Sequence, residues 1–268
     1  MAKGKAFTLI ELLVVISMIA LLMAILLPSL QRVRKQAKTI ACQSNQKQWG
    51  LIFSAYTSDN DGDFWTLGHG IIRPFEPFLP PETSDYNDLF LCPTANRATN
   101  LQDEGALGAE LKRGNTFYPW VERNVANQSW IISGYGLNMF IFDHADPSYG
   151  TVWIDRYEVW GTCLVRGATR VPIFLDSKVP TEGPLPPHTP PPEYEDMISA
   201  LGMKAYCMNR HDGGINCLFM DWSVRKVGIK ELWTLKWHRQ WDTANIWTKA
   251  GGARPEDWPE WMRHFKDY

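Results

Sequence analysis

The sequence lacks the short motifs that mark many enzymes. It has no nucleophile elbow, no P-loop and no H-E-x-x-H string, and it lacks a C-x-x-C pair that would favour a zinc or redox site. Its formal net charge at pH 7 is only −2, which gives no reason to expect a nucleic acid as partner. These absences argue against an enzyme and favour a structural or binding role.

The most informative segment of the sequence is an unbroken apolar run from Leu12 to Leu27. It follows a single acid, Glu11, and a short basic leader. As a helix, residues 7–27 span roughly 31 Å, about one hydrocarbon core. No A-x-A-like site follows at once, as it would in an ordinary secretory signal. The run therefore predicts a transmembrane helix, with Glu11 at its edge, where a carboxylate needs a partner for its charge.

The helical pattern continues beyond the apolar run. Apolar or small residues recur at three-to-four spacing from Val33 to Ala55, with polar faces between them. One helix is therefore predicted over residues 7–58. Its first half would form a membrane or filament core, and its second half would lie against a globular domain. Pro28 should kink this helix or open its hydrogen-bond ladder.

An aspartate-rich string, Asp59-Asn60-Asp61-Gly62-Asp63, follows this helix. Such residues end helices, because their side chains bond to nearby backbone groups. The alternating oxygens of Asp59, Asp61 and Asp63 also resemble a calcium loop, although Phe64 stands where that loop needs glycine. A helix terminator is the preferred interpretation, calcium is the alternative, and no other cofactor is predicted.

The remaining residues, 59–268, predict one globular domain of mainly antiparallel β-structure, which makes the fold class α+β. Strands are predicted from short β-branched and aromatic runs at 130–133, 151–154, 171–175 and 215–219, and 221–227 should pair with the last of these. Trp233, Trp237 and Trp241 recur every four residues, which predicts a C-terminal helix over 229–247. This stripe favours core packing, and the alternative is a surface that binds polysaccharide or a secreted substrate.

The N-terminal string resembles the signal of type IV pilins and type II secretion pseudopilins. In that family the leader is cut before an aromatic residue, and glutamate is the fifth residue of the mature chain. The resemblance implies a leader at 1–6, cleavage between Ala6 and Phe7 by a prepilin peptidase, and N-methylation of Phe7. Glu11 is then fifth and Pro28 twenty-second, where pilins often carry proline. The family usually has glycine at the position of Ala6.

The resemblance also implies a function. The chain would be a structural subunit of a type IV pilus-like or type II secretion filament, with Glu11 neutralising the terminus of an adjacent identical or homologous subunit. It would be a single-pass inner-membrane protein, N-in and C-out, served by an inner-membrane assembly platform, and then part of a periplasmic or surface filament. A positive-inside count predicts the opposite orientation, because four bases follow the apolar run: Arg32, Arg34, Lys35 and Lys38. The leader match overrides that count. A membrane-anchored binding module is the alternative function.

Strings further along the chain resemble those of large pilin-like proteins of Planctomycetes, Verrucomicrobia and Lentisphaerae. They are Cys42 to Gln48, Leu91-Cys92-Pro93, Ser133 to Asn138, Arg170 to Ser177, and an H-x9-DG-like element from His211 to Asp221 in which Trp222 replaces the glycine. His211, Asp212, Asp176 and Asp221 could converge on a metal or perform acid–base chemistry. Hydrogen bonding around a Gly-Gly hairpin is the preferred interpretation.

The chain has five cysteines. If the globular domain lies outside the cytoplasm, disulfides are permitted, and the odd count leaves at least one thiol unpaired within the chain. Cys207 and Cys217 flank the Gly-Gly element almost symmetrically, which predicts a pair across a hairpin. Cys42 and Cys92 are the other predicted pair, and their bond would clamp the helix to the globular domain.

Overall fold

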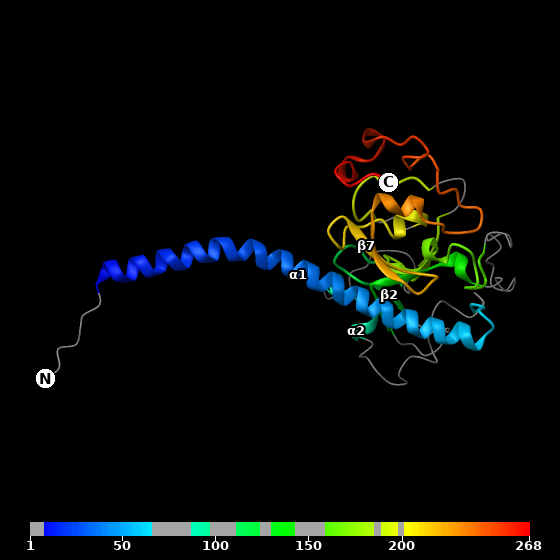
Figure 1. Ribbon diagram of the computed structural model, residues 1–268, viewed down its shortest axis with the longest axis horizontal. Helices are drawn as coiled ribbons and strands as arrows, with labels where there is room; N and C mark the ends of the chain where they lie inside the picture. Colours follow the sequence, from blue (N-terminus) through cyan, green and yellow to red (C-terminus); the bar gives the residue numbers. More distant parts are fainter. Residues whose placement is uncertain are drawn as a thin grey trace.

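The computed structural model describes residues 8–65, 87–96, 111–123, 130–142, 159–184, 189–197 and 201–268. A long helix, α1 (Leu9–Asp59), projects from a globular head formed by the described residues that follow it (Figure 1). The predicted strand at 151–154, the leader and Phe7 lie outside the described residues. The C-terminus lies on the head (Figure 1).

Helix α1 confirms the helix predicted over 7–58. It begins after Thr8, whose side chain accepts a hydrogen bond from the Glu11 backbone N–H, and it runs through Pro28 without a break. Proline has no N–H to donate, so the ladder loses one bond there, and the helix curves gently along its length (Figure 1). The helix ends at Asn60, where Asp61 and Gly62 take positive φ angles of 56° and 90°.

Two sheets form the head. A three-stranded antiparallel sheet has the order β1-β2-β3, and a five-stranded sheet has the order β6-β4-β5-β7-β8. The bounds are β1 Leu111–Lys112, β2 Trp120–Arg123, β3 Trp130–Ser133, β4 Tyr135–Asn138, β5 Pro172–Asp176, β6 Thr181–Glu182, β7 Gly214–Phe219 and β8 Val224–Gly228. A short helix, α2 (Asn87–Phe90), lies beside α1. Short 3-10 turns are Met139–Ile141, Ala168–Arg170 and Gly202–Ala205.

The fold is therefore α+β and mainly antiparallel, as predicted. Strands β3, β5 and β7 lie at the predicted positions within one residue, and β8 pairs with β7 from Gly214↔Gly228 to Leu218↔Val224. The exception is β6, which runs parallel to β4. All the other pairings in both sheets are antiparallel.

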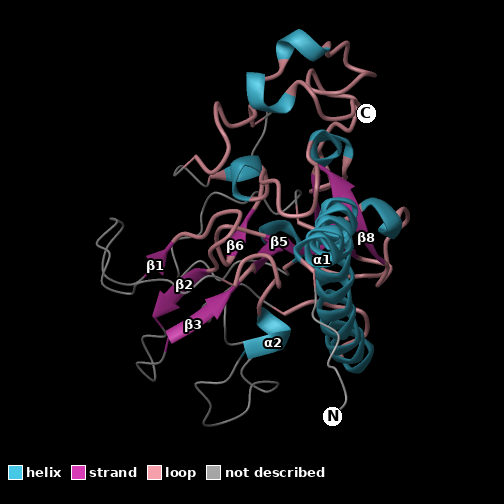
Figure 2. Ribbon diagram, turned by 90° about the vertical axis from the view of Figure 1, so that its left-hand side faces the viewer, coloured by secondary structure: helices cyan, strands magenta, loops and turns pink. Residues whose placement is uncertain are grey.

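The five-stranded sheet separates two hydrophobic cores. Alternate residues of β7 point to opposite faces: Leu218 packs with Trp49 and Phe53 of α1, whereas Cys217 and Phe219 pack with the C-terminal segment. The half of α1 nearest the head therefore serves as one layer of the domain (Figure 2).

The predicted C-terminal helix over 229–247 is wrong. The structure describes all of residues 229–268, and they form only 3-10 turns: η6 (Lys230–Thr234), η7 (Pro255–Asp257) and η8 (Glu260–Met262). Indole and amide donors occupy the carbonyls that a helix would use. The Leu232 carbonyl accepts from Trp237 Nε1 at 2.8 Å, and the Trp233 carbonyl accepts from Trp241 Nε1 at 3.2 Å and from Asn245 Nδ2. The four-residue spacing thus reflects packing of the indoles and not an α-helix.

Candidate functional site

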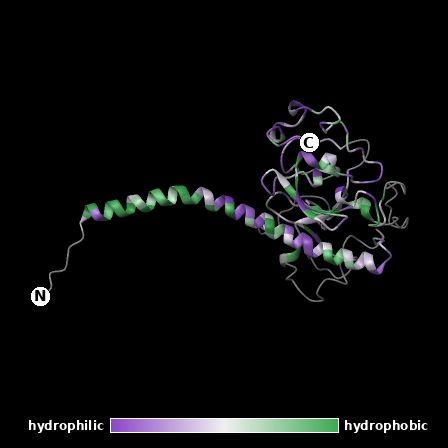
Figure 3. Ribbon diagram, in the orientation of Figure 1, coloured by the Kyte–Doolittle hydropathy of each residue, from purple (hydrophilic) through white to green (hydrophobic). Residues whose placement is uncertain are grey.

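The outer half of α1 is an apolar rod that no other described part of the chain covers. Every residue from Leu9 to Leu27 is exposed, including Leu9 at 85% and Ile25 at 68%. Figure 3 shows the outer half of α1 as hydrophobic and the part that approaches the head as mainly hydrophilic. By length and composition this is the one helix among the described residues that could cross a membrane. A surface of this kind requires lipid or other apolar helices around it.

Glu11 is held by its own helix terminus. Its Oε2 accepts hydrogen bonds from the Thr8 backbone N–H and hydroxyl, both at 2.9 Å, while Thr8 Oγ1 accepts from the Glu11 N–H. This reciprocal arrangement is a capping box. Ala6 and Phe7, the predicted processing site, lie outside the described residues, so the proximity of Glu11 to a new terminus stays a prediction.

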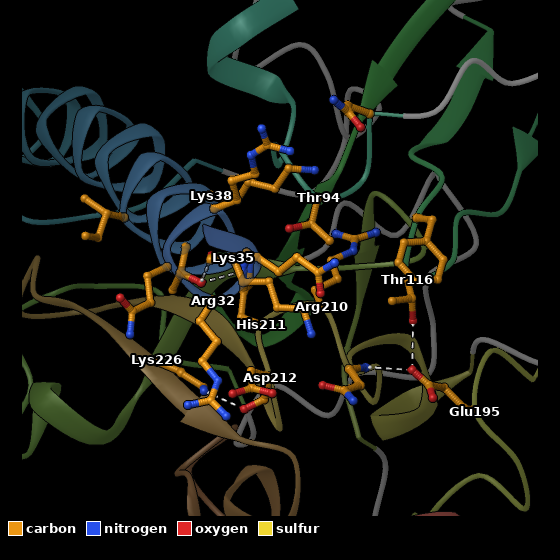
Figure 4. Close-up of a pocket in the computed structure, with 18 of the residues that line it drawn as sticks. Arg32, Lys35, Lys38, Thr94, Thr116, Glu195, Arg210, His211, Asp212 and Lys226 are labelled. Atoms are coloured by element: carbon orange, nitrogen blue, oxygen red, sulfur yellow. Dashed lines mark hydrogen bonds between the residues drawn. The ribbon is translucent and has the colours of Figure 1, made fainter. Parts of the chain in front are cut away.

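A basic recess lies where α1 meets the head (Figure 4). Its volume is about 1450 Å³. The bases that follow the apolar run line one side, and Glu195, Asp196 and Asp212 contribute acids from the head; the bases are Arg32, Arg34, Lys35 and Lys38. These four bases thus share one recess with acidic side chains of their own chain.

Four buried side chains meet beside this recess, and one of them, His211, also lines it. Ligand-type atoms of Cys42, Cys92, Asp176 and His211 all lie within 4.8 Å of one another. Cys92 Sγ is 3.3 Å from His211 Nε2, and His211 Nε2 is 3.2 Å from Asp176 Oδ2. Cys42 Sγ lies 3.7 Å from Asp176 Oδ1. The cysteines and Asp176 are fully buried, and His211 is 3% exposed.

Four different segments supply these side chains. Cys42 lies on α1, Cys92 opens the turn after α2, and Asp176 is the last residue of β5. His211 lies in the tight turn before β7, where its N–H donates to the Gly214 carbonyl at 2.9 Å. Asp212 and Gly213 take positive φ angles in that turn, which lets the chain reverse within a few residues.

The residues around the cluster hold it in place. Arg210 binds the Asp176 carboxylate at 3.2 Å and also donates to the Gly134 carbonyl. The Asn216 backbone N–H donates to Asp176 Oδ2 at 2.8 Å. The Tyr135 hydroxyl reaches Cys42 Sγ at 3.4 Å, and the Thr39 hydroxyl lies 3.2 Å from His211 Nδ1. Sequence reasoning did not single out these supporting residues, although Arg210 and Tyr135 stand in strings that carried the resemblance.

The pKa values of the cluster follow from this packing. Burial alone would raise the pKa of Asp176, but the charge and hydrogen bond of His211, with Arg210, lower it to about 2. Burial would lower the pKa of His211, but Asp176 raises it to about 9. Burial would raise the pKa of the Cys92 thiol, but hydrogen bonds from Cys42 and His211 lower it to about 6. The pKa of Cys42 is raised well above its usual value, mainly by burial.

The string from Ser133 to Asn138, which carried part of the resemblance, has a structural role here. Asn138 Nδ2 donates to the carbonyls of Pro172 and Trp237, both at 2.9 Å, and its Oδ1 accepts from the Phe140 N–H. One side chain therefore joins β4, β5 and the C-terminal segment. At Gly136 an added Cβ would lie 2.3 Å from the Val179 carbonyl oxygen, so only glycine fits there.

The H-x9-DG-like element is divided between the core and the surface. His211 belongs to the buried cluster, whereas Asp212 and Asp221 are exposed. Asp221 accepts from the Ser223 N–H and hydroxyl and thus shapes the turn between β7 and β8. Trp222 adopts a φ of 65° there, the left-handed conformation that glycine adopts without strain.

These positions weaken the enzyme hypothesis. The sequence predicts that catalysis would gather His211, Asp176 and Asp221 in an open cleft. His211 and Asp176 do lie together, but their side chains are at most 1% exposed, and Asp221 lies on the surface instead. Hydrogen bonding around the Gly-Gly turn is present as expected, through the His211 N–H and the Gly214 carbonyl.

The binding-module alternative loses its indole surface. Trp233 and Trp237 are fully buried, and Trp241 is 2% exposed. They form part of the core between the sheet and the C-terminal segment, together with Trp258. Core packing was the preferred interpretation of this stripe and is the observed one.

The predicted disulfides and the calcium site remain predictions. All five cysteines carry free thiols in the structure, with Cys42 beside Cys92 and with Cys207 and Cys217 buried in the same core. The carboxylates of Asp59, Asp61 and Asp63 are exposed at the end of α1. That position suits a helix terminator.

Comparison with known proteins identifies the N-terminal segment. Residues 1–27 match the family model described as the prokaryotic N-terminal methylation motif. No curated protein and no solved structure matches the chain. The chain therefore carries a prepilin-type signal ahead of a long N-terminal helix and is pilin-like or pseudopilin-like in that region. The motif implies processing by a prepilin peptidase and association with the membrane. It is typical of structural, non-enzymatic proteins.

Proposed function

We propose that this protein is a structural subunit of a type IV pilus-like or type II secretion filament. The proposed organisation is a leader at 1–6, a helix at 7–58 that spans the inner membrane with residues 7–27, and a head at 59–268 outside the cytoplasm. Cleavage between Ala6 and Phe7, followed by N-methylation of Phe7, would give the mature subunit.

The exposed apolar half of α1 carries this proposal. It lies within the matched residues 1–27, and nothing in the described chain covers it. Before assembly, the bilayer would surround residues 7–27. In a filament the same surface would pack against the equivalent helices of identical or homologous subunits, and the heads would coat the outside. The inner half of α1 is already one layer of the head, so rod and head form a single mechanical unit.

Glu11 would contribute to assembly through its charge. Cleavage before Phe7 creates an α-amino group one helical turn from Glu11. The Glu11 carboxylate could pair with this amino group of its own chain or with the amino group of a neighbouring subunit. A carboxylate in an apolar bundle is unfavourable unless a positive group answers it. Pairing with the terminus of the adjacent subunit would satisfy both charges.

The basic recess supports an N-in, C-out orientation despite the positive-inside count. Arg32 and Lys35 share the recess with Glu195, Asp196 and Asp212 of the head. Acids in the same recess offset part of the positive charge of these bases within the chain itself. The head therefore offers a location for this positive charge on the far side of the membrane.

Two measurements test the proposed function. Mass spectrometry of the native N-terminus should find a chain that begins at methylated Phe7; an intact leader would contradict the proposed processing. Glu11→Leu should leave processing normal and greatly reduce filament yield. Glu260→Leu, the same change at an exposed acid of the head, serves as the control and should preserve filaments. A normal filament yield from processed Glu11→Leu would remove the assembly role.

A further inference from the structure

The buried cluster has the composition of a metal site. Two thiols, an imidazole and a carboxylate face one another inside the head, within 4.8 Å. We propose that Cys42, Cys92, Asp176 and His211 together bind one zinc ion, which fastens helix α1 to the head. Borderline-soft donors of these three types suit zinc, whereas calcium requires a shell of oxygens.

The distances fit tetrahedral coordination. Zinc bonds of about 2.3 Å to sulfur and about 2.0–2.2 Å to nitrogen and oxygen place the ligand atoms of a tetrahedron roughly 3.4–3.8 Å apart. Three of the observed separations are 3.3 Å from Cys92 Sγ to His211 Nε2, 3.2 Å from that nitrogen to Asp176 Oδ2, and 3.8 Å from Cys42 Sγ to the same carboxylate oxygen; all four ligand atoms lie within 4.8 Å of one another. Side-chain shifts of up to about 1 Å would therefore bring all four ligand atoms to tetrahedral separations.

The surroundings orient the ligands before any metal arrives. His211 Nδ1 is engaged by the Thr39 hydroxyl at 3.2 Å, which leaves Nε2 toward the sulfurs. The Asn216 N–H and the Arg210 guanidinium fix the Asp176 carboxylate. Such partners set the rotamer and basicity of metal ligands.

The charges also balance. Two thiolates and a carboxylate bring three negative charges into the core, and the Arg210 guanidinium neutralises one of them through its ion pair with Asp176. A divalent cation compensates the other two and leaves the buried centre neutral, the condition that burial of charge requires. His211 and Arg210 also line the basic recess, so the cluster lies next to a solvent-filled space (Figure 4).

A disulfide between Cys42 and Cys92 is the competing state of the same two residues. It would use two of the four groups and requires an oxidant, and it gives the imidazole and the carboxylate no role beside the sulfurs. Zinc uses all four groups without any redox step. The two states differ in whether Cys42 and Cys92 are free thiols after denaturation, so the thiol state of these two residues separates them.

The decisive experiment uses the full-length protein, purified in detergent without reductant and without chelator. Metal content is measured by mass spectrometry, and thiols are counted with a colorimetric reagent after denaturation. We expect one zinc ion per chain and all five thiols. Chelation should lower the thermal midpoint, and added zinc chloride should restore it. Mass-spectrometric mapping of the alkylated cysteines shows which thiols are present, and a bond between Cys42 and Cys92 without zinc would overturn the proposal, whatever the state of Cys207 and Cys217. Five thiols with no zinc, and no uptake of added zinc, would also overturn it.

Variants identify the ligands. Cys92→Ser and His211→Gln should reduce the zinc content to background, while Cys163→Ser, at a part-exposed cysteine outside the cluster, should retain one ion. Thr39→Val tests the orienting hydroxyl on the partly exposed surface of α1 and should weaken zinc binding by roughly 10–100-fold. If a ligand variant fails to fold, chelation and zinc return in the unaltered protein still decide the question. Normal zinc content in folded His211→Gln would remove His211 from the site.

Discussion

Replacing Trp49 by alanine should weaken the packing of the inner half of α1 on the head. The indole of Trp49 is 1% exposed, packs edge-on against Phe90 with ring centroids 4.7 Å apart, and lies 5.7 Å from the ring of Phe174. Its Nε1 donates to the Leu89 carbonyl at 3.0 Å. The substitution therefore leaves a cavity between α1, the five-stranded sheet and α2. It also removes the hydrogen bond that the Leu89 carbonyl accepts from Trp49.

The expected loss of unfolding free energy is about 4 kcal/mol. Truncation of a buried aromatic residue to alanine costs roughly 3–5 kcal/mol, and the lost hydrogen bond places this case in the upper half of that range. For a domain of about 200 residues, each kcal/mol lowers the melting temperature by roughly 2–4 °C, so the midpoint should fall by about 8–16 °C.

Thermal unfolding in detergent, followed by near-ultraviolet circular dichroism, measures this change. Leu51→Ala is the matched control, since Leu51 lies two residues away on the same helix but is 62% exposed. Its effect should stay within about 0.5 kcal/mol. If Trp49→Ala unfolds within about 1 kcal/mol of the unaltered protein, then α1 is not a structural layer of the head, and the reasoning fails.

Two further predictions concern charge inside the head. The Lys230 ammonium is buried and lies 2.6 Å from Asp267, so Asp267→Ala should lower the unfolding free energy measured by chemical denaturation by about 3 kcal/mol. Glu256→Ala removes an exposed ion pair and should lower it by less than about 0.5 kcal/mol. Equal effects of the two variants would refute this prediction. Burial lowers the pKa of His238 from 6.5 to about 4, so the unfolded chain takes up this proton first as the pH falls. The contribution of the neutral His238 side chain to the unfolding free energy is fully present above pH 6.5. It falls by at most about 3 kcal/mol as the pH is lowered to 4. His238→Phe should flatten that slope between pH 7.5 and pH 5, and an unchanged slope would contradict the assignment.

The sequence predicted the elements that have a strong local pattern. The long helix was evident because apolar spacing persists on both sides of Pro28 and ends at an aspartate-rich string. The pairing of β7 with β8 followed from alternation and a short turn. The helix predicted from the C-terminal tryptophans is wrong because their four-residue spacing indicates only that the indoles pack in the same core. It does not reveal that Trp237 Nε1 and Trp241 Nε1 would bond to backbone carbonyls and replace the helical ladder.

The buried cluster lay largely beyond sequence reasoning. Zinc sites announce themselves through closely spaced ligands, and here Cys42, Cys92, Asp176 and His211 stand far apart in the chain. Their meeting depends on how α1 crosses β7, a tertiary contact with no local signature. The strings that resembled pilin-like proteins did contain all four residues. The resemblance therefore pointed to these residues but did not predict that their side chains meet in one buried cluster.

The capping box at the start of α1 bears on what would hold a filament together. A free subunit already satisfies the Glu11 carboxylate with the backbone and hydroxyl of Thr8. Joining a neighbour would exchange that internal partner for an external one, so the electrostatic gain of docking is only the difference between the two pairings. The packing of the apolar helices, rather than the Glu11 charge, would then supply most of the free energy that holds a filament together.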